Sequence, residues 1–235
     1  MTIAEITYTL EQKLQILSSN VYSNLLTHEI LLQFDNVVDR YIDACLSPKP
    51  MGSLLGVDDT QLSVDNLRFL KVIETNLVRT ITIDKTSFHT LPANYRNLIN
   101  DSSEVLICGV PTWVGNRQIG AEELKENIDQ NPFIKAKKFS PLSRVVSNDL
   151  LVTTHDGVPP SNVKIEYFKK PTRLYDIWTG VTGGNPNDDT YGFNDFPRNV
   201  IDLFIDLLKN RLLETFESPR LPGSVQEVKN FGTLN

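Results

Sequence analysis

The sequence has little of what disulfide frameworks, metal sites and membrane spans require. Its 235 residues contain two cysteines and three histidines. Cys45 falls in a helical pattern and Cys108 in an apolar, strand-like run far along the chain, so we expect two buried free thiols rather than a disulfide. The longest apolar runs are shorter than the roughly 20 residues that a bilayer requires. We therefore predict no membrane-spanning segment and no membrane partner.

An excess of basic charge is also lacking. The formal net charge is −6 at pH 7, whereas proteins whose main task is to hold nucleic acid neutralise many phosphates with lysine and arginine. The hydrophobic content of 40% and the charged content of 22% are ordinary for a folded domain. The composition therefore indicates a folded protein and argues against one whose main task is to bind nucleic acid, although an acidic protein can still touch DNA locally.

Complete catalytic and cofactor motifs are missing as well. His28-Glu29 begins like a zinc-protease helix, but Leu32 stands where the second histidine ligand is needed. The glycine-rich stretch 180–192 does not end in the Gly-Lys-Ser/Thr that a phosphate-binding loop requires. We therefore predict a protein that is not an enzyme, with no catalytic residue, no cofactor and no metal.

Helical periodicity is present towards both ends of the chain, and β-branched runs lie between them. Apolar spacing predicts helices over residues 9–20 with Thr9 as cap, from Thr27 to Leu46 with Thr27 as cap, and after Ser63 as far as Leu77. A long, very apolar helix is expected from Pro197, with Asp195 as its cap. Strands are predicted over residues 78–83, 105–110, 150–154 and 163–168.

These elements predict an α+β fold in which N-terminal helices and a long C-terminal helix pack with a small, mostly antiparallel β region. We expect a single domain over residues 1–235. It is divided into helical parts over 1–100 and 197–218, a β-rich part over 101–178, an exposed loop over 179–196 and an extended tail over 219–235.

Two groups of residues are candidates for contacts with other molecules. The most basic local stretch contains Lys135, Lys137 and Lys138, and such a stretch binds phosphate groups or acidic partners, or is simply a solvated face. Trp178 and Tyr191 flank the glycine-rich loop; aromatic residues of this kind anchor interfaces, although they also pack in cores. We predict these five residues as interface positions.

Four segments follow one another in an order that carries a resemblance. They are Leu91–Ile99, of the form Leu-Pro-x-x-Tyr-x-x-Leu-Ile, then Asn131-Pro132-Phe133, then Val163–Pro171, and finally the helix that Pro197 opens. In this order they resemble the ring, or head-to-tail connector, proteins of tailed bacteriophages, most closely those of crAss-like phages. The resemblance covers residues 9–215 and departs from the family at Asn94, where an acidic residue is more usual.

The resemblance implies a structural virion protein with a single connector-type domain. Its subunits would form a homo-oligomeric, cyclic ring, twelvefold in symmetry, at the head-tail junction beneath the portal protein. Further tail or ring proteins would be neighbours, and genomic DNA would pass transiently through the conduit. Assembly would take place in the bacterial host cytoplasm.

Two other functions stay open at the level of sequence. One is a virion-associated glycan or cell-wall hydrolase that uses two dispersed carboxylates, since the chain has 29 acidic residues. The other is a cargo protein that contacts nucleic acid through the basic stretch at 135–144. Neither has a local sequence signature beyond these residues.

Overall fold

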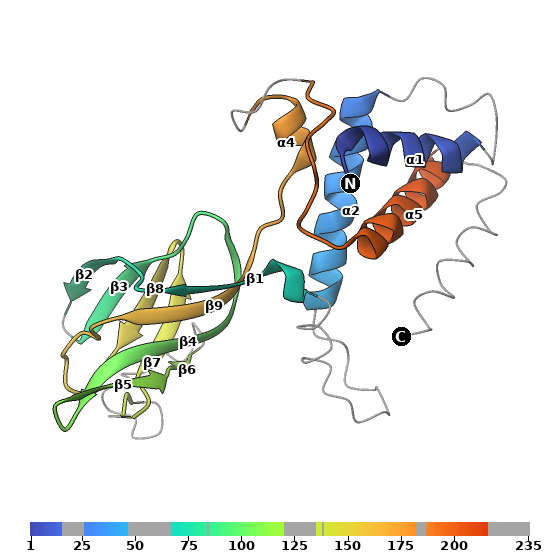
Figure 1. Ribbon diagram of the computed structural model, residues 1–235. Coiled ribbons are helices and arrows are strands. Elements are labelled where there is room, and N and C mark those ends of the chain that lie inside the picture. Colours follow the sequence, from blue (N-terminus) through green and yellow to red (C-terminus); the bar gives the residue numbers. More distant parts are fainter. Residues whose placement is uncertain are drawn as a thin grey trace, which may run out of the picture. The chain divides into compact units, whose positions relative to one another are not determined.

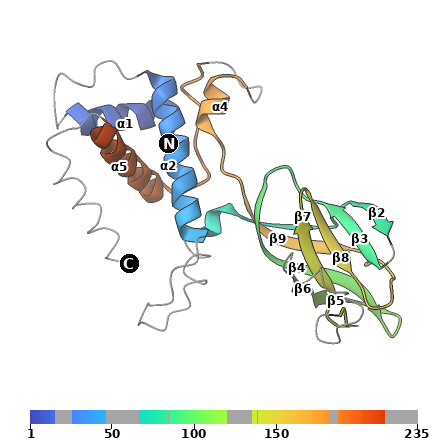
Figure 2. The same cartoon turned by 180° about the vertical axis from the view of Figure 1, so that it is seen from behind.

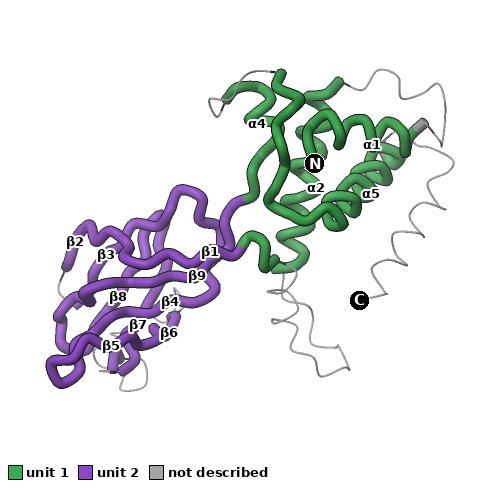
Figure 3. The backbone as a smooth tube through the Cα atoms, viewed as in Figure 1, with its two compact units in different colours: residues 1–70, 171–235 green, residues 71–170 purple. Residues whose placement is uncertain are grey.

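The chain has an α+β fold that divides into two compact units (Figures 1 and 3). The structure is a computed structural model, and it describes residues 1–15, 26–46, 67–83, 85–119, 135–137, 139–181 and 187–215. Unit 1 comprises Met1–Leu70 and Pro171–Asn235, and unit 2 comprises Lys71–Lys170. Helices make up unit 1 and mostly antiparallel sheets make up unit 2, which confirms the predicted fold class.

Unit 1 contains four α-helices and a short 3-10 turn among the described residues. The helices are α1 (Ile3–Gln15), α2 (Thr27–Leu46), α4 (Leu174–Trp178) and α5 (Arg198–Thr215), and the turn η1 spans Arg68–Leu70. The predicted start of the first helix at Thr9 is wrong. Thr2 and Glu5 form a reciprocal capping box, in which the Thr2 N–H donates to the Glu5 carboxylate at 2.8 Å and the Glu5 N–H donates to the Thr2 hydroxyl at 3.2 Å.

The second helix has the predicted bounds, whereas its predicted cap, Thr27, is wrong. Leu26, rather than Thr27, precedes the first turn of α2, and its carbonyl accepts the N–H groups of Glu29 and Ile30. At α5 the carbonyl of Pro197 accepts the first helical N–H groups. Asp195 accepts the N–H of Thr172 at 2.5 Å, so its carboxylate fixes the chain ahead of α4.

The core of unit 1 is built around aromatic rings from segments far apart in the sequence. Phe204 of α5 lies 6.1 Å from Phe34 and 5.1 Å from Tyr41, both of α2, and 5.1 Å from Phe196, as measured between ring centroids. Phe193 meets Phe34 at 5.5 Å. Phe193 and Phe196 are both buried, so the predicted exposed loop over 179–196 is wrong for this part.

Unit 2 consists of two sheets, seen from the other side in Figure 2. The four-stranded sheet has the order β1 (Lys71–Thr75), β9 (Val163–Lys169), β4 (Tyr95–Ile107) and β5 (Val110–Gly115). The five-stranded sheet has the order β2 (Arg79–Ile83), β3 (Thr86–Thr90), β8 (Asp149–Thr153), β7 (Leu142–Val146) and β6 (Arg117–Gln118). The core of this unit is mainly aliphatic, with Leu150, Val152, Val163 and Ile165 fully buried.

The predicted helix after Ser63 is wrong, because β1 begins at Lys71 and the helical region of 1–100 therefore ends at Leu70. Leu67 and Leu70 are buried as predicted, but Val72, rather than Ile73, packs against the core of unit 2. Pairing of β1 with β9 puts alternate residues on opposite faces. This tertiary pairing overrides a helical spacing that was present in the sequence.

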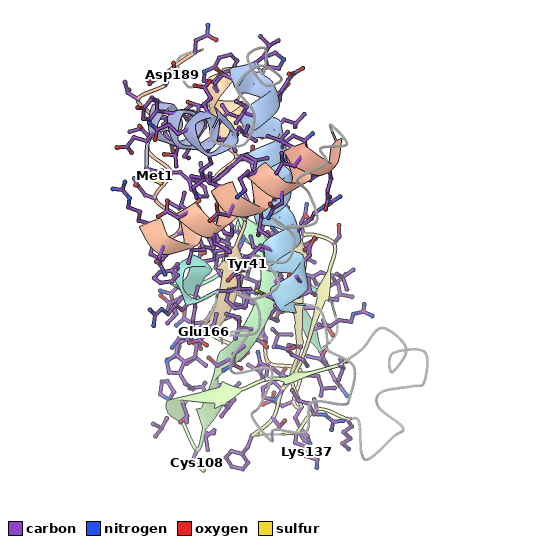
Figure 4. All side chains as sticks on the ribbon, turned by 90° about the vertical axis from the view of Figure 1, so that its right-hand side faces the viewer. Met1, Tyr41, Cys108, Lys137, Glu166 and Asp189 are labelled. Atoms are coloured by element: carbon purple, nitrogen blue, oxygen red, sulfur yellow. The ribbon has the colours of Figure 1, made fainter. Side chains whose placement is uncertain are left out.

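The predicted strands at 78–83, 150–154 and 163–168 are confirmed as β2, β8 and β9. The one predicted at 105–110 is a hairpin instead: β4 ends at Ile107 and β5 begins at Val110. Cys108 and Gly109 form the turn, with φ of 54° and 81°, as type I′ turns require. Neither cysteine is in a disulfide, as predicted, but Cys108 is exposed at this tip (Figure 4) and Cys45 is only half-buried, so the predicted burial is wrong.

Several predictions fall on residues outside the described ranges. They concern the Asn131-Pro132-Phe133 segment, Lys138, the end of the first helix beyond Gln15, the last residues of the 197–218 helix and the tail over 219–235.

Candidate functional site

A buried carboxylate joins the two sheets of unit 2. Asp101 of β4 accepts hydrogen bonds from the Asn116 amide at 2.6 Å, the Ser143 hydroxyl of β7 at 3.1 Å and the Gln118 amide of β6 at 3.4 Å. Burial raises the pKa of Asp101, and these three donors oppose the rise. The carboxylate is enclosed by its donors, so its role is to hold the sheets together.

A second buried pair, Ser87 and His89, has the residue types of a hydrolytic dyad. The Ser87 hydroxyl lies 3.0 Å from His89 Nε2, and His89 Nδ1 lies 3.4 Å from the Leu77 carbonyl. Both side chains are buried, at 1% and 2% exposure, and burial lowers the pKa of His89. A substrate cannot reach a hydroxyl sealed in this way, so the pair stabilises β3 and performs no chemistry there.

The buried carboxylate of unit 1 is Asp35, on α2. Its two oxygens accept the N–H groups of Leu174 and Tyr175, each at 3.0 Å, and so hold the first turn of α4. Burial raises the pKa of Asp35 to about 6, while the two N–H donors lower it. This contact fastens the segment that follows β9 to α2.

The structure brings Trp178 into a small cluster on unit 1. Its ring stacks on His28 with centroids 6.2 Å apart, and its indole N–H donates to Asp189 at 3.0 Å. Tyr191 accepts the N–H of Ile3 through its carbonyl at 3.0 Å. Residues 187–193 are therefore tied to the start of α1 and to α4 by bonds within the unit, and the Tyr191 side chain remains exposed.

The two described lysines of the basic stretch belong to unit 2. Lys135 and Lys137 are exposed on either side of Ala136, and Lys137 pairs with Ser140 through backbone hydrogen bonds of 3.0 and 3.1 Å (Figure 4). Ala136 packs with Ile119 and Leu142 in a small buried cluster. The predicted interface residues are thus divided between the units: Trp178 and Tyr191 in unit 1, Lys135 and Lys137 in unit 2.

One surface that the sequence reading missed lies on the five-stranded sheet. Cross-strand register places side chains in two rows, Ile81–Phe88–Leu151–Arg144 and Ile83–Thr86–Thr153–Leu142. Leu150 and Val152, on the opposite side of β8, are buried in the core, so these rows form the outward side, which we call the outer face. The β-branched run at 78–83 was the available signal, but sequence alone does not give the register.

Among the residues in the described ranges, no group of three histidine, cysteine, aspartate or glutamate side chains is placed to hold a metal ion. None of the described helices combines the length and apolarity needed to cross a bilayer. The sequence matches no protein-family model and no curated protein.

Proposed function

We propose that the chain is a structural virion protein, a ring subunit of a phage head-to-tail connector beneath the portal. Copies of the chain form a closed cyclic ring that is part of the DNA conduit, with the portal and further tail or ring proteins above and below. The proposed function is non-enzymatic, and the three buried polar sites described above, at Asp101, at Ser87 with His89 and at Asp35, support it because each holds elements together.

The observation that carries the proposal is that two of the resembling segments meet in the structure. Tyr95, from Leu91–Ile99, lies 5.8 Å from the ring of Tyr167, from Val163–Pro171. The Tyr167 hydroxyl donates to the Asn94 side chain at 3.0 Å, and the Lys170 N–H donates to the Asn94 carbonyl at 2.6 Å. Segments about 70 residues apart thus form one contact, which supports reading them as a single motif.

The contact also explains the position at which the chain departs from the family. Asn94 accepts the Tyr167 hydroxyl through its amide oxygen, a role that a carboxylate oxygen of an acidic residue fills equally well. The departure therefore preserves the hydrogen bond between the two segments.

The distribution of charge is compatible with a conduit. Unit 1 carries 18 acidic and 10 basic residues and unit 2 carries 11 acidic and 13 basic residues, giving formal net charges of −8 and +2. An acidic wall repels the DNA backbone, whereas a basic wall would hold the duplex and slow its passage. In a ring of this chain, unit 1 is the part suited to face the DNA.

The proposal is tested by the state of assembly. We expect native mass spectrometry of the purified full-length chain, and electron cryo-microscopy of particles that contain it, to show a closed ring with more than about 1,000 Å² buried between neighbouring copies. A chain that stays monomeric at all concentrations and is present as a single copy in the particle would contradict it. So would a glycan hydrolase activity that one carboxylate substitution abolishes.

A further inference from the structure

The outer face of the five-stranded sheet is apolar, and its β2 end lies open. Ile81 and Ile83 are 57% and 55% exposed, and the register puts Phe88 and Leu151 beside Ile81 on the same side. At the β7 end, by contrast, Ile119 and Ala136 cover Leu142. Exposed apolar side chains that adjoin one another in this way mark a contact surface.

The strand at the open end carries few of the features that keep edges from pairing. The other sheet's edge strands do carry them: β1 has Lys71 and Glu74, and β5 has Pro111. In β2 the side chains are Arg79, two threonines and two isoleucines, with one irregularity in register after Arg79. Beyond that irregularity, residues 80–83 of β2 carry no charged side chain and no proline.

Basic side chains border this face. Arg144 ends the row that begins at Ile81, and Lys135 and Lys137 flank the alanine that covers Leu142. The acidic residue in register on this side is Asp149, paired with Val146. Among the described residues on and beside this face, three positive groups against one carboxylate favour an occupant with acidic groups around an apolar centre.

Unit 1 presents such a surface on α1. Tyr8 is 61% exposed, and Glu5 and Glu11 are exposed on the same side of the helix, three residues before and after it. Unit 1 as a whole has a formal net charge of −8, against +2 for unit 2. Charge and apolar content therefore match between these two surfaces of the same chain.

We propose that the outer face of one copy binds the α1 surface of a second copy, with the Ile81–Phe88–Leu151 row against Tyr8 and the lysines towards Glu11. The inference rests on the proposed ring function and deepens it by naming the contact. Because the two surfaces differ, each copy can use its outer face towards one neighbour and its α1 towards the other. Such a head-to-tail contact is the kind that generates rings, whereas a self-complementary contact stops at a dimer.

The first test places a charge in the apolar centre. In the full-length chain, Ile81→Lys should raise the dissociation constant of self-association by about tenfold or more, measured by sedimentation velocity over a concentration series. Ile73→Lys is the matched control, because Ile73 is 54% exposed on an edge strand of the other sheet, and it should assemble like the unchanged chain. Both substitutions are at exposed positions, and equal thermal melting of the variants checks folding.

The second test exchanges the charges. Lys135→Glu with Lys137→Glu should weaken assembly, and so should Glu11→Lys, since each change opposes like charges across the contact. The triple variant that combines them should assemble again, because the opposite pairs are restored with reversed sign. Recovery in the triple variant is a result that simple misfolding cannot produce.

The outcomes separate this inference from the proposed function. If the unchanged chain forms rings and Ile81→Lys forms them equally well, the outer face is not the contact and the ring function stands. If the unchanged chain never self-associates, both proposals fail. If the lysine changes abolish binding to duplex DNA and leave self-association intact, the face is a nucleic-acid surface and the inference is overturned.

Discussion

The two units of this chain solve the same problem of burying a core in different ways. Unit 1 packs aromatic rings between helices, with Phe34, Phe193, Phe196 and Phe204 in mutual contact. Unit 2 closes two sheets over aliphatic side chains and one buried tyrosine. The first unit is strongly acidic and the second slightly basic.

The two units also differ in the sequence separation between the elements that contact each other. In unit 2 three of the strand pairs are hairpins of neighbouring strands: β2–β3, β4–β5 and β7–β8. In unit 1 the N-terminal helices meet α5, as in the ion pair of Lys13 with Asp206 at 2.6 Å. Unit 2 is one continuous segment with several pairs of neighbouring strands, whereas the core of unit 1 requires both ends of the chain. The helical unit should therefore depend most on single long-range contacts.

The largest expected effect comes from removing the ring that joins those ends. Phe204 is fully buried and touches Phe34, Tyr41 and Phe196. Phe204→Ala should lower the free energy of unfolding of unit 1 by about 3–5 kcal/mol, since it leaves a cavity among groups that cannot all collapse. Chemical denaturation measures this loss of free energy. Hydrogen exchange should show that the amides of α2 and α5 lose protection.

The half-buried Leu203 on the same helix serves as the control, and Leu203→Ala should cost much less. If the two units are as separate as their cores suggest, β8 and β9 keep their protection in Phe204→Ala. Equal loss of hydrogen-exchange protection in both units would contradict this separation and show that the two units unfold as one cooperative structure.

The second effect depends on pH and concerns Asp35, which holds α4 on α2. Its pKa in the folded state is raised to about 6 by burial, from 3.8, so the folded chain binds more protons than the unfolded chain between these values. The contribution of Asp35 to stability is therefore fully present below about pH 3.8 and falls as pH rises through 6. The fall amounts to about 3 kcal/mol.

Asp35→Asn removes this titration. The difference in unfolding free energy between the unchanged chain and Asp35→Asn, measured from pH 4 to pH 7, should therefore shift against the unchanged chain as pH rises. A difference that stays constant over this range would show that Asp35 titrates normally. Asp101→Asn, in unit 2, tests whether the other buried carboxylate behaves in the same direction, since burial raises its pKa too.

Elements with one clear period are predictable from this sequence, and elements decided by distant partners are not. Helix α2 and strands β8 and β9 have apolar patterns that match their buried sides. Residues 67–77 fit a helical spacing equally well, and only pairing with β9 selects the strand. Thr2-Ile3-Ala4-Glu5 was a readable capping box, so the start of α1 could have been found.

The candidate surfaces likewise divide into those that local sequence predicts and those that depend on distant partners. Exposure of Lys135 and Lys137 agrees with their position in a basic, polar stretch. Phe193 and Phe196 sit among glycine, asparagine and aspartate, and nothing local indicates that their partners are Phe34 and Phe204. The outer face depends on the register of β2, β3 and β8, which a one-residue change would reverse.

A smaller effect in unit 2 tests the contact between the two resembling segments. Tyr167→Phe removes the hydroxyl that donates to Asn94 at 3.0 Å and approaches Glu74 at 3.4 Å, and the ring stays in the core. It should lower the unfolding free energy by about 1 kcal/mol. Protection should fall in β9 and β4 and remain unchanged in α5. Asn94→Ala should lower the unfolding free energy by a similar amount. The double variant Tyr167→Phe with Asn94→Ala should be no less stable than either single variant, because both changes remove the same hydrogen bond.

The smallest effect compares two helix starts within unit 1. The α1 sequence Thr2-Ile3-Ala4-Glu5 completes a capping box, whereas Leu26-Thr27-His28-Glu29 at α2 has the glutamate but no hydroxyl at the first position. Leu26 is 55% exposed, so little packing is lost when it is replaced. Leu26→Ser should therefore raise the unfolding free energy of unit 1 by about 0.5 kcal/mol, and Thr2→Ala should lower it by a similar amount. Both changes should be visible in the exchange of α5 amides and absent from β8, because α1 and α2 share a core with α5. A stabilised Leu26→Ser variant whose β8 amides are also better protected would show that the helical and β units unfold together.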